Sequence, residues 1–191
     1  GIIVTCGATI NWLKDNLDLF AESKNTETMA LSVPDSNGVY LVPAFSGLGA
    51  PHWQMGLKAA ILGLTLGCDK NHIVRAALEA IAYQSKDLIG AMEADSGIEM
   101  TTLKVDGGAV ANDFLMQFQS DIVGVPVHRP KIIETTALGA AMLAGLAVGF
   151  WNDTEELAAS WQEERCFEPR ATSDWRKGLL DQWQEAINRI Y

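Results

Sequence analysis

Two glycines and an asparagine near the middle of the chain have the types and spacing of a ligand-binding turn. Gly107 and Gly108 follow a short segment of alternating polarity, residues 103–105, and Asn112 stands where a helix is expected to begin. Glycines lack Cβ atoms, so a ligand can approach the main chain closely. A helix start adds free N–H donors with partial positive charge. The pattern predicts a site for a phosphate group or a nucleoside.

An ordinary strand-to-helix connection would explain the same residues, so the local sequence leaves both interpretations open. The chain contains no G-x-G-x-x-G spacing at this turn, no G-x-x-x-x-G-K-S/T phosphate loop and no kinase glycine-rich loop. Gly7 is a second candidate, because it lies at the expected start of another helix, with Asn11 one turn further on. Alternatively, Gly7 is only a turn residue and Asn11 is solvated.

Composition and charge exclude several classes of protein. A chain of 191 residues suits one globular domain, and its 24 acidic against 14 basic side chains argue against binding to nucleic acid or to an anionic membrane surface. The three cysteines are widely spaced and only three histidines occur, which favours free thiols over a structural zinc site. No signal peptide is visible in the sequence. We therefore expect a cytoplasmic protein.

The candidate residues must be positioned by alternating strands and helices. We expect strands at 2–5, 39–42, 59–64 and 103–105, an extended piece at 126–130, and helices at 10–20, 26–33 and 70–94, from 112, from 135, at 153–161 and at 173–191. This alternation predicts an α/β fold with a mixed sheet and helices on both faces. We see no second domain boundary, so residues 1–191 are expected to form a single domain.

Two further features carry specific expectations. The apolar run 137–151 is shorter than the roughly 20 residues needed to span a bilayer. Because it is rich in glycine and alanine, it predicts a buried, close-packed helix. His52 lies in a loop with two glycines, two prolines and two aromatic residues, residues 43–53, which either lines a cleft or covers a sheet edge. No partner for this histidine is visible, and we interpret it as structural.

Several blocks of sequence, covering nearly the whole chain, resemble the C-terminal half of the glycerol kinases in the FGGY family of carbohydrate kinases. The third block below is similar to the adenosine motif of these kinases almost residue for residue. The blocks are N-G-V-Y-L-V-P-A-F-S-G-L-G-A-P at 37–51, A-A-I-L-G-L at 59–64 with H-I-V-R-A-A-L-E at 72–79, V-D-G-G-A-V-A-N at 105–112 with F-L-M-Q-F-Q-S-D at 114–121, T-T-A-L-G-A-A at 135–141 and G-L-A-V-G-F-W at 145–151.

The resemblance implies an actin-like, ribonuclease H-like ATPase domain, the nucleotide-binding half of a two-domain kinase whose N-terminal domain lies outside this chain. Gly7, Gly108 and Asn112 match nucleotide contacts of the family, and Gly107 completes the turn. Asn11 stands where these kinases usually have glutamine. Its side chain is one methylene shorter, so its hydrogen bond to the nucleotide would be lost or bridged by water.

The resemblance also implies the activity, which is phosphorylation of glycerol by ATP in the full-length protein. The catalytic aspartate and most ligands of Mg²⁺ would come from the N-terminal domain, so no catalytic residue and no metal ligand is assigned within this chain. The implied partners are a nucleotide and a small polyol, without nucleic acid or membrane, and the full-length protein would be a homo-oligomer. The chain alone should be inert as a kinase.

Three departures from the family pattern support two alternatives. Gln54 stands where the family usually has Asp, and Leu66 and Lys58 stand where it usually has Arg, so a carboxylate and a guanidinium are lost. These departures favour another sugar or ketose kinase of the FGGY family. Together with Asn11, they also favour a catalytically inactive nucleotide-binding module.

Overall fold

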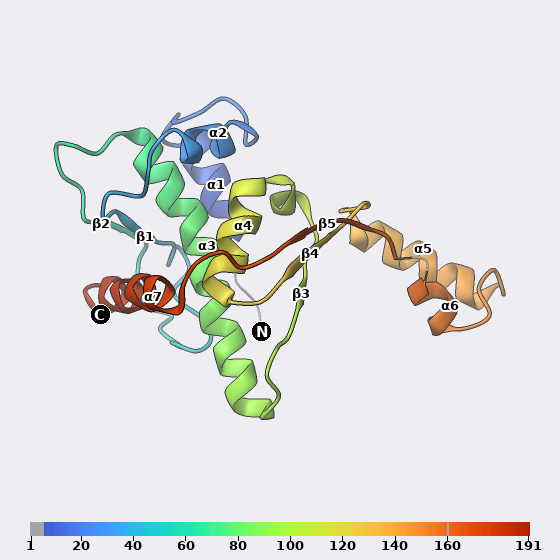
Figure 1. The fold of residues 1–191 in the computed structure, drawn as a ribbon. Coiled ribbons are helices and arrows are strands. Elements are labelled where there is room, and N and C mark those ends of the chain that lie inside the picture. Colours follow the sequence, from blue (N-terminus) through green and yellow to red (C-terminus); the bar gives the residue numbers. More distant parts are fainter. Residues whose placement is uncertain (1–5, 160) are drawn as a thin grey trace.

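The structure, a computed structural model, describes residues 6–159 and 161–191, and a long central helix organises it. This helix, α3 (Lys70–Ser96), contacts α1 (Cys6–Asp15), α2 (Asn25–Leu31) and α4 (Asp113–Val123) (Figure 1). It begins at a capping box, in which the Asp69 carboxylate accepts from the backbone N–H of Asn71 at 2.8 Å and His72 Nδ1 accepts from the backbone N–H of Asp69 at 3.1 Å. It ends at Gly97 in the left-handed conformation.

The strands that the structure describes form two small sheets. In the first, β1 (Tyr40–Val42) pairs antiparallel with β2 (Ala60–Leu62). In the second, β3 (Leu103–Lys104) runs parallel to β4 (Val127–Pro130), which pairs antiparallel with β5 (Glu163–Phe167). The predicted mixed sheet is therefore present. Strand β5 was not expected from the sequence, because three of its five residues are charged.

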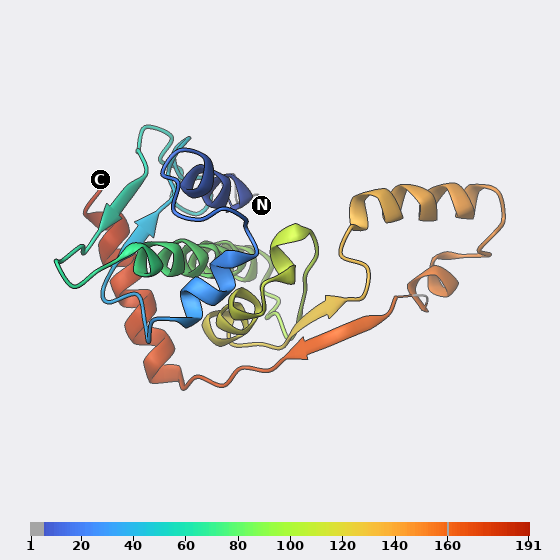
Figure 2. The ribbon, with the colours of Figure 1, turned by 90° about the horizontal axis from the view of Figure 1, so that it is seen from above.

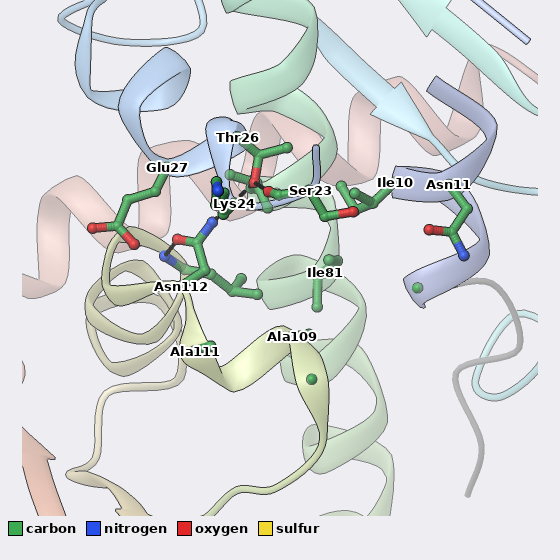
Figure 3. A pocket seen from close by; sticks show the side chains of 14 residues that line it. Ile10, Asn11, Ser23, Lys24, Thr26, Glu27, Ile81, Ala109, Ala111 and Asn112 are labelled. Carbon is green, nitrogen blue, oxygen red and sulfur yellow. Dashed lines mark hydrogen bonds between the residues drawn. The ribbon is translucent and has the colours of Figure 1, made fainter. Parts of the chain in front are cut away.

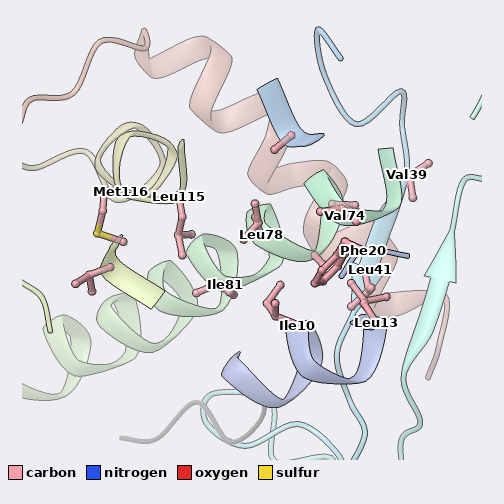
Figure 4. Close-up of a cluster of buried hydrophobic side chains, with 14 of the residues drawn as sticks. Ile10, Leu13, Phe20, Val39, Leu41, Val74, Leu78, Ile81, Leu115 and Met116 are labelled. Carbon is pink, nitrogen blue, oxygen red and sulfur yellow. The ribbon is translucent and has the colours of Figure 1, made fainter. Parts of the chain in front are cut away.

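A large apolar cluster joins the helices that surround α3. Ile10 and Leu13 of α1 pack with Leu78 of α3, and Leu115 of α4 lies further along the same cluster (Figure 4). A second cluster forms where α7 (Ser173–Asn188) crosses α3. There the rings of Tyr83 and Trp183 stack with centroids 5.3 Å apart. These clusters fix the relative positions of α1, α3 and α4.

The segment between β4 and β5 projects from the rest of the molecule and carries α5 (Thr135–Ala147) and α6 (Thr154–Ala159) (Figure 2). The helix predicted over 137–151 is present, but the expectation that it is buried is wrong, because no residue of α5 is buried and Leu143 is 70% exposed. Small residues allow close packing only where another element faces them. Among residues 6–159 and 161–191, none of the helices combines the length and apolarity that crossing a bilayer requires.

Other boundaries differ locally from the expectations. The strand expected at 2–5 lies outside the described residues. Helix α1 ends at Asp15 rather than at residue 20, and Asp18 adopts a positive φ of 57° that a continuing helix excludes. Between Gly107 and α4 the chain forms a short 3₁₀ helix, η1 (Gly108–Ala111), which the sequence pattern did not indicate.

Candidate functional site

A pocket of about 430 Å³ lies between α1, α2, α3 and η1 (Figure 3). It brings together four of the five predicted site residues, Gly7, Asn11, Gly108 and Asn112. Its volume falls in the range of small-molecule sites. The full lining consists of Gly7, Ile10, Asn11, Ser23, Lys24, Thr26, Glu27, Leu78, Ile81, Gly108, Ala109, Ala111, Asn112 and Leu115.

The glycines leave bare main chain at the pocket wall. A Cβ built on Gly7 or Gly108 would meet no atom within 4 Å, so no side chain occupies the space beside them. The first N–H groups of a 3₁₀ helix have no acceptor within the helix, and those at the start of η1 are therefore suited to bind an external acceptor.

Gly107 has a different part in this turn and is not among the lining residues. Its φ of 84° is a conformation that side-chain-bearing residues rarely adopt. Its N–H donates to the backbone oxygen of Ile133 at 2.8 Å, so this amide is already engaged. Gly107 therefore shapes the turn that presents Gly108.

Asn112, which stands where the sequence predicts the start of a helix, caps α4. Its Oδ1 accepts from the backbone N–H of Leu115 at 2.9 Å. Its Nδ2 donates to Oγ1 of Thr26 at 3.2 Å. Figure 3 shows the Asn112 and Thr26 side chains directed toward one another, with Asn11 on α1 at the other side of the pocket.

The side of the pocket formed by α2 and the residues before it was not anticipated. It contributes Ser23, Lys24, Thr26 and Glu27, which belong to no motif and reach the pocket only through tertiary contacts. Glu27 Oε2 accepts from the backbone N–H of Asp113 at 2.9 Å. Consecutive residues of α2 thus hold the start of α4.

A buried ion pair on α3 fixes the other end of α2. Arg75 Nη1 donates to the backbone oxygens of Ala30 at 3.1 Å and Val33 at 2.7 Å, and Arg75 Nε donates to Glu79 Oε1 at 2.8 Å. Glu79 is only 4% exposed, and burial raises the pKa of its carboxyl group despite the nearby guanidinium. The pair therefore sets the position of α2 relative to the pocket.

A second arginine supports η1 from the sheet. Arg129 Nη1 donates to the backbone oxygen of Val110 at 2.8 Å and to Asp113 Oδ1 at 2.7 Å, and its Nε donates to Glu164 Oε2 at 2.7 Å. Burial alone would lower the pKa of Arg129, but hydrogen bonds to Glu164 and Asp113 outweigh it and raise the pKa above its ordinary value. Asp113 also pairs with Arg165.

The floor of the pocket is apolar. It is formed by Ile10, Leu78, Ile81 and Leu115, each exposed by 9% or less. An apolar floor with a polar rim of amides suits a ligand that has a flat apolar face and polar edges. A nucleobase with its attached sugar and phosphates has this character.

The loop residues singled out in the sequence lie elsewhere. His52 has a partner after all, because its Nε2 is 3.0 Å from Asp87 Oδ2, to which Trp183 Nε1 also donates at 2.8 Å. The interpretation of His52 as a histidine without a partner was therefore wrong. The partner is 35 residues away in the sequence, so no local pattern indicates it. The lining of the pocket includes none of the departures Gln54, Lys58 and Leu66.

The described residues offer no site for a metal ion. Within residues 6–159 and 161–191, no three or more His, Cys, Asp or Glu side chains are grouped so that they could hold one. The three cysteines are free thiols.

Comparisons with known proteins show a family to which this chain is similar. The model of the FGGY family of carbohydrate kinases, C-terminal domain, matches residues 1–148. Over 189 residues the chain is 58% identical to glycerol kinase of Symbiobacterium thermophilum and 55% identical to glycerol kinase 2 of Thermotoga maritima. Both matches cover 99% of this chain and 38% of the relative, so the chain spans well under half the length of these curated relatives.

Solved structures show the same fold. The crystal structure of Plasmodium falciparum glycerol kinase with ADP matches with a TM-score of 0.87 and 36% identity, over 97% of this chain and 37% of that one. Xylulose kinase of Lactobacillus acidophilus matches with a TM-score of 0.78 over 96% of this chain and 38% of that one, but at 24% identity this likeness concerns the fold alone. The expected actin-like α/β ATPase fold is thereby confirmed.

Proposed function

The chain belongs to the FGGY family of carbohydrate kinases, and we propose that it is the C-terminal domain of a protein that transfers the γ-phosphoryl group of ATP to glycerol. In this proposal residues 1–191 form the nucleotide-binding half of the cleft. The rest of the protein supplies the polyol site and the base that takes the hydroxyl proton. Eight curated relatives at 54–58% identity are named as glycerol kinases, which supports glycerol as the substrate.

The observation that carries the proposal is the convergence of Gly7, Asn11, Gly108 and Asn112 on one pocket with bare main chain in its wall. We place the base over the apolar floor beside Asn112 and the phosphates toward Gly108 and the first turn of α1. Free backbone N–H groups at a helix start favour phosphate oxygens at that end. That the Plasmodium falciparum enzyme was solved with ADP supports a nucleotide as the ligand.

The function of this domain in the reaction would be positioning. Phosphoryl transfer proceeds with little covalent participation of protein groups, so its rate depends on aligning the phosphoryl group with the acceptor and on neutralising charge. The chain carries a net charge of −10, which opposes an anionic ligand. Local amide donors must therefore provide the attraction, together with a divalent cation.

The described residues contain no group of three or more His, Cys, Asp or Glu side chains that could hold Mg²⁺. We therefore propose that the cation is held by the nucleotide phosphates and by groups outside this chain, and that it neutralises phosphate charge there. Residues 6–159 and 161–191 then contribute the orientation of the nucleotide and the exclusion of water from one side of the cleft.

The proposal is tested by assaying the full-length protein with ATP and either glycerol or xylulose. Turnover of glycerol is the expected result. Turnover of xylulose alone would replace glycerol by a ketose as the substrate. ADP binding without turnover of either compound would identify an inactive nucleotide-binding module.

A further inference from the structure

Thr26 occupies an unusual position for a residue of a short surface helix. It is only 2% exposed and lines the pocket from α2, opposite η1 (Figure 3). Its Oγ1 donates to the backbone oxygen of Ser23 at 2.6 Å and accepts from Asn112 Nδ2 at 3.2 Å. Both hydrogen bonds of this hydroxyl therefore join it to residues that also line the pocket, Ser23 and Asn112.

These bonds determine which way the Asn112 carboxamide faces. Because the only hydroxyl hydrogen of Thr26 is given to Ser23, Oγ1 can only accept from Asn112, and the atom facing it must be the NH₂ group. The backbone N–H of Leu115 is a donor, so the atom facing it must be the amide oxygen. Two independent contacts therefore agree on one orientation of the amide.

The same accounting shows what Asn112 can offer to a ligand. Among the described residues, one hydrogen of Nδ2 and one lone pair of Oδ1 have no partner. A carboxamide with one free donor and one free acceptor has the groups that pair with adenine, which presents N7 as an acceptor and N6 as a donor. Guanine presents two acceptors, N7 and O6, at the equivalent edge.

We infer that Thr26 is a positioning residue that holds the Asn112 amide in the orientation that selects an adenine over a guanine nucleotide. This inference rests on the proposed function, in which a nucleotide binds in this pocket. Without the Thr26 hydroxyl, the hydrogen bond from the Leu115 backbone N–H is the remaining contact of the two that orient the amide. The amide plane can then rotate about it, and the edge offered to the base is no longer fixed.

The test compares ADP and GDP binding to the full-length protein by calorimetry. The Thr26→Val variant keeps the shape of the side chain and removes the hydroxyl, Thr26→Ser restores it, and Thr28→Val is a matched control because Thr28 is exposed on the same helix and does not line the pocket. We expect the wild type to prefer ADP by about tenfold or more. Thr26→Val should weaken ADP binding about fivefold and reduce the preference, whereas Thr26→Ser and Thr28→Val should behave as the wild type.

A double-mutant cycle tests whether Thr26 acts through Asn112. Asn112→Ser keeps an oxygen for the helix cap and removes the amide. If the inference holds, adding Thr26→Val to Asn112→Ser produces no further loss of ADP affinity. A crystal structure of the Thr26→Val variant should show the Asn112 amide rotated or in more than one orientation.

The outcomes separate this inference from the proposed function. A wild type that binds neither nucleotide overturns the proposed function. Three results would overturn the inference alone. The wild type could bind ADP and GDP equally, or the Thr26→Val variant could keep the wild-type preference for ADP over GDP. The third result is a double variant whose loss of ADP affinity equals the product of the losses in the two single variants.

Discussion

The Arg129 guanidinium donates a hydrogen bond to the backbone oxygen of Val110 at 2.8 Å, and so joins β4 to the turn that presents Gly108. Val110 is the buried residue of η1, and its carbonyl group would otherwise lack a protein partner among the described residues. The same guanidinium binds the side chain of Asp113, the first residue of α4. A single side chain of the sheet thus stabilises both the turn and the helix that follows it.

Replacing Arg129 by methionine should therefore destabilise the domain around η1. We expect a loss of about 1–3 kcal/mol in the free energy of unfolding, because the Val110 oxygen and two carboxylates lose a charged donor. Urea unfolding of the 191-residue chain measures this loss. Arg170→Met is the control, since the Arg170 side chain is exposed. Equal stabilities of the two variants would show that the contact is not needed.

Asp87 should also stabilise the fold, although it does not line the pocket. It accepts from His52 at 3.0 Å, from Trp183 Nε1 at 2.8 Å and from Gln184 Nε2 at 2.9 Å, and its side chain is 11% exposed. Asp87→Ala leaves these donors without an acceptor and should cost about 2–4 kcal/mol.

The control for Asp87 is Asp181→Ala, which removes only an exposed pair with Lys177. Its unfolding free energy should stay close to that of the wild type. Nucleotide affinity of the folded protein should be unaffected in both variants. If Asp87→Ala unfolds at the same urea concentration as Asp181→Ala, the cluster does not stabilise the domain.

The three thiols should differ in reactivity with pH. Hydrogen bonds from Thr65 lower the pKa of Cys68, whereas burial raises the pKa of Cys6 and of Cys166. Only the thiolate reacts with iodoacetamide. Below the ordinary pKa of a cysteine, a larger fraction of Cys68 than of Cys6 or Cys166 is therefore in the thiolate form. We expect Cys68 to be alkylated first, with a rate that rises at lower pH than the rates of the other two.

Mass spectrometry of peptides after timed alkylation measures the three rates separately. Thr65→Val removes the hydroxyl that contacts the Cys68 sulfur and should move its rate profile to higher pH. If Cys6 or Cys166 were labelled faster than Cys68 at neutral pH, the prediction that Cys68 is the most reactive thiol would be wrong.

Much of the architecture could be predicted because it is encoded locally. Helix α3 was expected from the spacing of its apolar residues and from the signals at its ends, and the structure places it at Lys70–Ser96 with Gly97 as its cap. The start of α4 was expected at Asn112 or Asp113, and the structure shows that Asn112 is the cap. Gly7, Asn11, Gly108 and Asn112 were placed together by resemblance to a family, and the pocket brings them together in space.

Features that depend on distant partners could not be predicted in this way. Thr26 reaches the pocket by a hydrogen bond to a residue 86 positions away. Strand β5 exists because it pairs with β4, although its residues are largely charged and exposed. The small residues of α5 indicate that it can pack closely, but not which element it packs against.

The central claim is that bare main chain at Gly108 contacts a bound nucleotide, and one pair of variants tests it most directly. A Cβ at Gly108 or at Gly178 of α7 would meet no atom within 4 Å, so Gly108→Leu and Gly178→Leu should both fold. Only the first places a side chain in the pocket. Calorimetric titration of the full-length protein with ADP should show at least about a tenfold loss of affinity for Gly108→Leu and none for Gly178→Leu. Wild-type ADP affinity in a folded Gly108→Leu variant would contradict the claim.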